Sequence, residues 1–163
     1  MLSRVRIAVL AAGVALPLAL PAQPALALLE SYGRVVALLS FMTVHVGELL
    51  LACSAKNVIS EDQVEARFRA YRERNAVLLE RAERWSQAAE KRLEAQGEGR
   101  AAQRQADDSG LSAMAAASAQ AQGQIGNAGD ARAACSARLA AIESGRYDLS
   151  VNAELVGLLK SDP

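Results

Sequence analysis

ISEDQVEARFRAYRERNAVLLERAERWSQAA, residues 59–89, is the stretch that sets the fold class of this chain. Ser60 and Gln63 can form a capping box, in which each side chain bonds the backbone N–H of the other residue. The residues that follow are spaced alternately by four and three, which is the period of a helix packed against another helix. This stripe consists of Val64, Phe68, Tyr71, Asn75, Leu78, Ala82, Trp85 and Ala89. The sequence therefore predicts a long helix over about residues 60–97.

Helical periodicity extends on both sides of this segment. Before it, a stripe with the same spacing predicts a helix over about residues 28–55. After it, residues 98–130 are a low-complexity run of Ala, Gln, Ser and Gly, for which both a thin, interrupted helix and a partly disordered linker stay open. The pattern then recovers as far as Ser144. We therefore expect an all-α, antiparallel three-helix bundle, with a third helix over about 108–144 and a short C-terminal helical tail.

The N-terminus has the three parts of a cleavable secretory signal peptide. Arg4 and Arg6 form a basic start, an apolar run follows to about Ala22, and Ala25-Leu26-Ala27 is a small-x-small cleavage site. Cleavage after Ala27 would leave residues 28–163 as a single helical domain. The two arginines are the only charged residues removed, so a balanced 18 to 18 becomes 16 basic and 18 acidic residues, or −2. A periplasmic or secreted location follows.

In that location the two cysteines predict one disulfide, Cys53–Cys135. A first turn centred near residue 57 places Cys53 opposite the start of the second helix. A second turn centred near residue 98 places Cys135 opposite the same point. Both cysteines are thus expected at one end of an up-down-up bundle.

Composition and motifs exclude several kinds of chemistry. A balanced charge does not suit a nucleic-acid-binding protein. One histidine and two cysteines cannot complete a four-ligand zinc site, and His45 with Glu48 supplies only two weak candidate metal ligands. Hydrolase, Walker and dinucleotide fingerprints do not occur. We therefore expect no enzyme activity and no cofactor.

Two features do not fit a simple three-helix bundle. Asn75 interrupts an apolar stripe, where it could set helix register or mark a loose seam. In the first helix, 14 of the 19 residues from Val35 to Cys53 are apolar, and Phe41, Val44 and Leu51 lie away from its main stripe. This second face is covered by the C-terminal leucines or by another chain. Stable membrane insertion of the helix is disfavoured by its ionisable residues, His45 and Glu48.

Residues 59–63, ISEDQ, resemble a relaxed form of the LTxxQ motif of periplasmic stress chaperones and metal-stress sensors, which are small helical hairpin dimers. The resemblance covers five residues with two substitutions, and this chain carries one copy where that family carries two, so no site residues are transferred. The expected function is a non-catalytic helical protein that binds an unidentified protein partner or itself, as an accessory part of an envelope assembly. A chaperone-like holdase is the alternative, and a metal-responsive protein that uses His45 is a lesser one.

Overall fold

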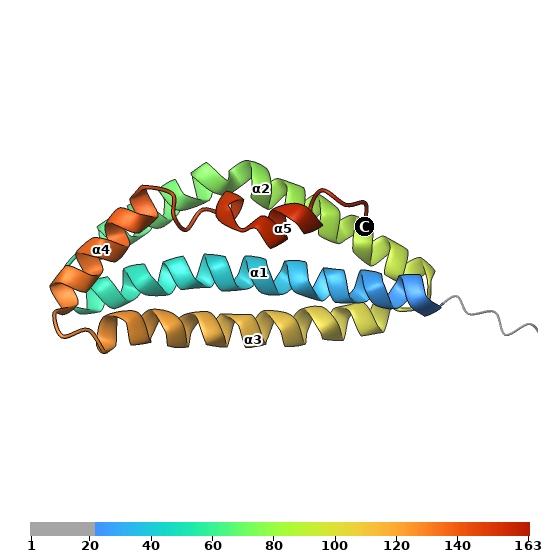
Figure 1. The fold of residues 1–163 in the computed structure, drawn as a ribbon, viewed down its shortest axis with the longest axis horizontal. Helices are drawn as coiled ribbons and strands as arrows, with labels where there is room; N and C mark the ends of the chain where they lie inside the picture. The colour runs from blue at the N-terminus through green and yellow to red at the C-terminus, as the bar shows by residue number, and fades with distance from the viewer. Residues whose placement is uncertain (1–21) are drawn as a thin grey trace, which may run out of the picture.

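The computed structural model describes residues 22–163, which fold into helices with no strand among them. Three long helices, α1 (Ala22–Ala55), α2 (Glu61–Ala95) and α3 (Gly99–Gly126), run up, down and up (Figure 1). They are followed by α4 (Ala131–Glu143), a 3-10 turn (Leu149–Val151) and α5 (Ala153–Leu158). The expected all-α bundle with a short C-terminal helix is confirmed. The proposed signal-peptide residues before Ala22 lie outside the described part of the chain.

α1 is the central helix of the bundle, with α2 on one side and α3 on the other (Figure 1). α1 and α3 are parallel: Gly33 lies beside Gln105, and further along both helices His45 lies beside Ala117. α1 and α2 are antiparallel: Tyr32 bonds Glu90, whereas the later residue Gly47 faces the earlier residue Phe68. The C-terminal segment covers a third flank of α1. No side chain of α1 between Val35 and Leu50 is therefore exposed.

The ends of the helices are set by local sequence. Ser60 and Gln63 form both bonds of the capping box at the start of α2. α1, α2 and α4 each end in a Schellman motif, in which the residue after the cap has a positive φ. These residues are Asn57, Gly97 and Gly145, with φ of 55°, 81° and 78°. The amide two residues after the cap bonds back five residues in each motif, as in Glu98 N–H to Leu93 O at 2.8 Å.

The low-complexity segment is helical over most of its length. α3 begins at Gly99, nine residues before the expected start near 108, because Ala102 and Ala106 already pack into the core. The predicted interruption falls after Gly126. There the chain turns, and the Asp130 side chain accepts the Ala133 N–H to start α4. Residues 98–130 therefore form a helix and a turn rather than a disordered linker.

The core has two parts, one at each end of the bundle. Near the α1–α2 turn, the cluster is built around Leu49, Leu50, Tyr71, Ile125 and the disulfide. At the other end, a second cluster joins the three long helices to the C-terminal segment. It consists of Tyr32, Val35, Ala82, Trp85, Ala89, Leu93, Ala102, Leu149, Leu155 and Leu159. The C-terminal leucines thus belong to the core, which accounts for much of the apolar surface of α1.

Small residues let α1 and α3 approach closely. Ala117 and Ala121 are fully buried, and Gly110 lies against Val36 and Ser40. A methyl group added at Gly110 would lie 3.5 Å from Val36 Cγ1 and 3.7 Å from Ser40 Oγ, which are ordinary contacts. Space for one more carbon therefore exists at this contact.

We expect Gly110→Ala to raise the free energy of unfolding by about 0.5–1 kcal/mol, since alanine loses less backbone entropy than glycine in a helix. Urea denaturation followed by circular dichroism measures the change. Gly33→Ala is the matched comparison, because its new carbon would lie 2.5 Å from Gln105 Nε2 and must displace that side chain. A loss of stability at Gly110 larger than that at Gly33 would contradict this packing.

Candidate interaction surface

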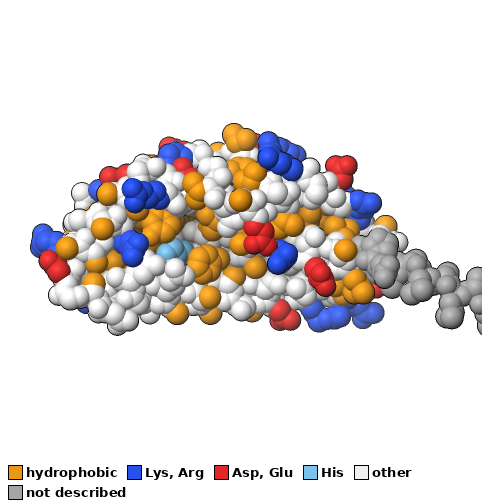
Figure 2. Space-filling model, viewed as in Figure 1, with side chains coloured by type: hydrophobic (Ala, Val, Ile, Leu, Met, Phe, Trp, Pro, Cys, Tyr) orange, Lys and Arg blue, Asp and Glu red, His pale blue; other side chains and the backbone are white. Residues whose placement is uncertain are grey.

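The outward side of α3 carries no charge over most of its length. The 21 residues from Ser109 to Gly129 contain no acidic, basic or histidine side chain. We call the solvent side of this stretch the uncharged face; it includes Leu111, Met114, Ala115, Ala119 and Gln122. Leu111 is 64% exposed and Met114 is 40% exposed. In Figure 2 the lower left edge, along the C-terminal part of α3, is mainly white and orange.

A small groove continues the uncharged face where α3 ends beside α1. It has a volume of about 360 Å³. Its lining consists of Glu48, Leu51, Ala52, Ala55, Lys56, Gln122, Ile125 and Gly126. Leu51 is 54% exposed at this point. The groove therefore joins an exposed leucine of α1 to the end of the uncharged face.

The three residues considered as a partner face differ in burial. Phe41 and Val44 are half-buried, and the Phe41 ring stacks on His45 with 5.5 Å between ring centroids. Of the three, only Leu51 is exposed. The structure thus brings Leu51 to the surface beside α3, while Phe41 and Val44 are largely packed within the chain.

A wider groove of about 850 Å³ lies between α1 and α2. Thr43 of α1 and Phe68, Ala76 and Leu79 of α2 supply its uncharged lining. Its charged lining consists of Glu65, Arg69, Arg72, Glu73, Glu80 and Glu83. Charges of both signs thus border the apolar side chains on this side of the molecule.

His45 is buried where α1 meets α3 and the loop after α4. It is 3% exposed, and its Nδ1 lies 3.2 Å from the Ala117 carbonyl oxygen. Burial lowers the pKa of His45 below its usual 6.5, and the positive charge of Arg138 lowers it further, although the bond to Ala117 opposes the shift. Glu48 is half-buried. Among the described residues, no group of three or more His, Cys, Asp or Glu side chains could hold a metal ion.

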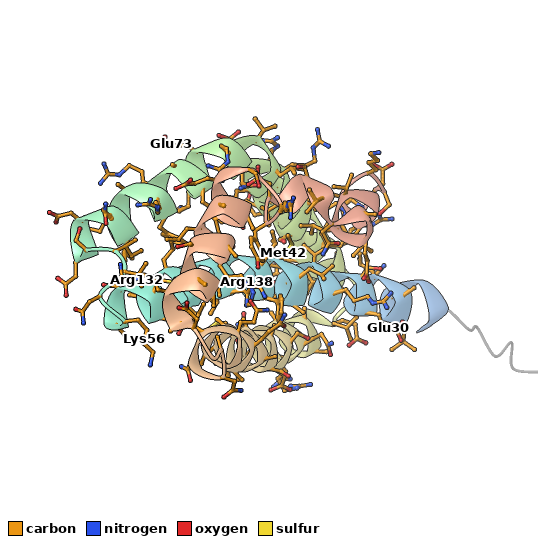
Figure 3. All side chains as sticks on the ribbon, turned by 60° about the vertical axis from the view of Figure 1, so that its left-hand side comes forward. Glu30, Met42, Lys56, Glu73, Arg132 and Arg138 are labelled. Carbon is orange, nitrogen blue, oxygen red and sulfur yellow. A yellow bond between two sulfur atoms is a disulfide. The ribbon has the colours of Figure 1, made fainter. Side chains whose placement is uncertain are left out.

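The disulfide joins Cys53 of α1 to Cys135 of α4, with 5.6 Å between the Cα atoms. Both cysteines lie at the end of the bundle where α2 begins, as predicted. The path by which the chain brings Cys135 to that end differs from the prediction. α3 already reaches that end at Gly126, and α4 then folds back across α1 (Figure 3). The bond favours an oxidising compartment, and the apolar N-terminal helix fits a signal sequence.

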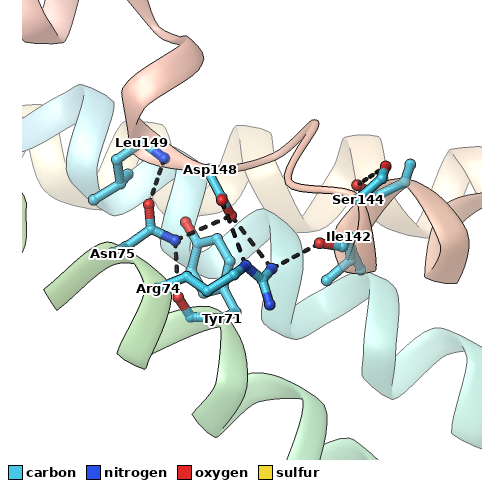
Figure 4. Close-up of polar contacts among 8 residues, drawn as sticks. Tyr71, Arg74, Asn75, Ile142, Ser144, Asp148 and Leu149 are labelled. Atoms are coloured by element: carbon cyan, nitrogen blue, oxygen red, sulfur yellow. Dashed lines mark hydrogen bonds and ion pairs between the residues drawn. The ribbon is translucent and has the colours of Figure 1, made fainter.

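Asn75 anchors the C-terminal segment, a role that differs from both interpretations of its place in the stripe (Figure 4). Its Oδ1 accepts the Leu149 N–H at 2.7 Å, and its Nδ2 donates to the Tyr71 carbonyl and to Asp148 Oδ1. Arg74 pairs with the same Asp148 at 3.3 Å and donates to the Ile142 carbonyl at 2.7 Å. A polar residue of the stripe thus fastens a segment more than 70 residues away.

α1 is also long and apolar enough to cross a membrane, by length and composition alone, between Ala25 and Ala55. A core helix and a signal sequence pass the same test. Comparison with family models, curated proteins and solved structures finds no match to this chain.

Proposed function

We propose that this is a non-catalytic protein of the periplasm or the secreted space that binds another protein, or a second copy of itself, through the uncharged face and Leu51. The uncharged face carries the proposal. Soluble surfaces usually intersperse charges of both signs, whereas the centres of protein interfaces are depleted of charge and enriched in methionine. Leu111, Met114 and Leu51 supply the exposed apolar area for such a contact.

The packing of α1 supports export with cleavage after Ala27. Leu26 and Ala27 are exposed, whereas the next two side chains, Leu28 and Leu29, pack against the core. Cleavage after Ala27 would therefore keep every residue that is described in the two core clusters. A disulfide buried in the core is consistent with the same destination.

The test replaces Leu51, Leu111 and Met114 by serine. We expect binding to weaken at least tenfold for each replaced side chain, because each loses well over 1 kcal/mol of apolar burial in the complex. Analytical ultracentrifugation measures self-association, and crosslinking in intact cells followed by mass spectrometry measures a heterologous partner. The melting temperature should change little, since the three side chains are already exposed.

Val77→Ser is the matched control, because Val77 is 69% exposed on the charged helix α2. It should leave association unchanged. Equal association of the triple-serine variant and the parent protein would overturn the proposed surface.

A chaperone-like holdase is the second candidate, and the α1–α2 groove favours it. Phe68 and Leu79 offer apolar contacts there between charged side chains. A holdase suppresses the aggregation of unrelated unfolded clients, and the triple-serine variant would retain that activity. If the triple-serine variant loses a single stoichiometric partner and its effect on client aggregation is unchanged, the result supports specific binding rather than holdase activity through the uncharged face.

A further inference from the structure

The C-terminal segment, residues 145–163, is a cover laid over one flank of α1. Leu149, Leu155 and Leu159 enter the core beside Tyr32 and Val35. Polar side chains of α2 fasten it: Asn75 and Arg74 hold its beginning, and the Trp85 indole N–H donates to the Ser161 carbonyl at 3.0 Å near its end. Its helical turns are only three and six residues long. Chain termini are among the parts of a folded protein that open at the lowest free energy.

His45 lies where this segment leaves α4. The Tyr147 ring lies against it, with 5.7 Å between ring centroids, and Phe41 stacks on it from within α1. Figure 2 shows the single imidazole of the chain as a small patch among hydrophobic side chains. The histidine therefore contacts α1, α3 and the first residues of the cover at once.

No carboxylate is paired with His45 in the described part of the chain. Arg138 of α4 acts on it and also donates to the Tyr147 hydroxyl at 3.4 Å. α3 contributes only the Ala117 carbonyl, because residues 109–129 are uncharged. Glu48 is the nearest carboxylate along α1, one turn away, and Asp148 is paired with Arg74 and Asn75. None of the ion pairs among the described residues includes His45.

We propose that protonation of His45 in mild acid releases the C-terminal segment from α1 and uncovers the apolar flank of α1 beneath it. Protonation places a positive charge in a site that is buried from water and lies near the positive charge of Arg138. Movement of Tyr147 away from His45 admits water to the ring and relieves that charge. Leu38, Leu39 and Met42 of α1, which pack against the covered cluster, then become accessible.

The direction of the pH dependence follows from the lowered pKa of His45. We call the state with the C-terminal segment packed on α1 closed and the state with it released open. Well above pH 6.5 the ring is neutral in both states, so the pH does not favour opening. As the pH falls below 6.5, the open state binds a proton that the closed state resists, and closure weakens until the pKa of the buried ring is passed. The disulfide keeps α4 attached to α1 throughout, so the opening is confined to the segment after α4.

The chain contains one histidine and one tryptophan, which makes the test direct. Trp85 is buried against the end of the cover, so its fluorescence reports release, while far-UV circular dichroism reports the long helices. Between pH 7.5 and 5.0 we expect the Trp85 emission to shift to the red with a midpoint below 6.5, with most helical signal retained. His45→Gln, which stays neutral and can still donate to Ala117, should lose that shift.

NMR titration of the single imidazole gives an independent measurement on the unaltered protein. The proposal requires a midpoint below 6.5 that coincides with the fluorescence change. An identical red shift in His45→Gln would overturn it, as would an imidazole midpoint at or above 6.5. Simultaneous loss of fluorescence and helical signal would also overturn it, because the whole bundle would then unfold.

Discussion

Replacing both Cys53 and Cys135 by alanine should lower the free energy of unfolding by roughly 4–5 kcal/mol, the entropy of closing a loop of this length. The two residues are 82 positions apart. The bond therefore restrains a large part of the unfolded chain. A typical domain is stable by about 5–15 kcal/mol, so we expect a fall in melting temperature on the order of 10–20 °C.

Chemical reduction must be carried out on unfolded protein, because both cysteines are fully buried in the core cluster. Urea denaturation of the oxidised protein, the protein reduced and refolded, and the double-alanine variant gives three values to compare. Reductant should have no effect on the double-alanine variant, which serves as the control. A difference below about 1 kcal/mol between the oxidised and reduced proteins would contradict a role of the bond in stability.

Asn75→Leu should lower the free energy of unfolding by about 2–4 kcal/mol, although leucine suits the apolar stripe better. Asn75 is 2% exposed and makes three hydrogen bonds. Its loss leaves the buried Leu149 N–H without an acceptor, and an unpaired buried group costs about 1–3 kcal/mol. Urea denaturation measures the change. Gln87→Leu, on the exposed side of the same helix, should change stability by less than about 0.5 kcal/mol.

Asn75→Asp sharpens this test because only one end of the side chain changes. An aspartate still accepts the Leu149 N–H, but it presents a carboxylate to Asp148, where the amide donated at 3.2 Å. We expect a large loss at pH 7 that shrinks as the pH falls and the carboxylate pair takes up a proton. A loss in Asn75→Asp that does not depend on pH would indicate that Asp148 is not the partner that matters.

The long helices could be predicted from the sequence because their determinants are local. The stripe after Ile59, the capping box at Ser60 and Gln63, and the breaks near Asn57 and Gly97 all act within a few residues. The early start of α3 was harder to predict. Alanine favours helix, but in an alanine-rich segment the buried and exposed positions hold the same residue. Ala102 and Ala106 therefore did not stand out as a buried stripe.

The tertiary roles depended on partners distant in the chain. Asn75 bonds Leu149, and no period or motif in the sequence links residues 74 positions apart. Whether Phe41 and Val44 were covered also depended on tertiary packing, which the spacing of apolar residues along α1 does not reveal. The uncharged face was present in the sequence as 21 residues without charge, but only the orientation of α3 shows that Leu111 and Met114 point outward.

The central position of α1 has a consequence for the order in which the chain is made. Of the described helices, α1 leaves the ribosome first, and every segment that covers it comes later. His45 meets Ala117 after another 72 residues, and Met42 meets Asn152 after another 110. α2 can pack against one side of α1 soon after it is made, but the sides that α3 and the C-terminal segment cover stay open until synthesis is nearly complete. Over that interval the apolar side chains on those sides of α1 are exposed, and such transient exposure favours aggregation.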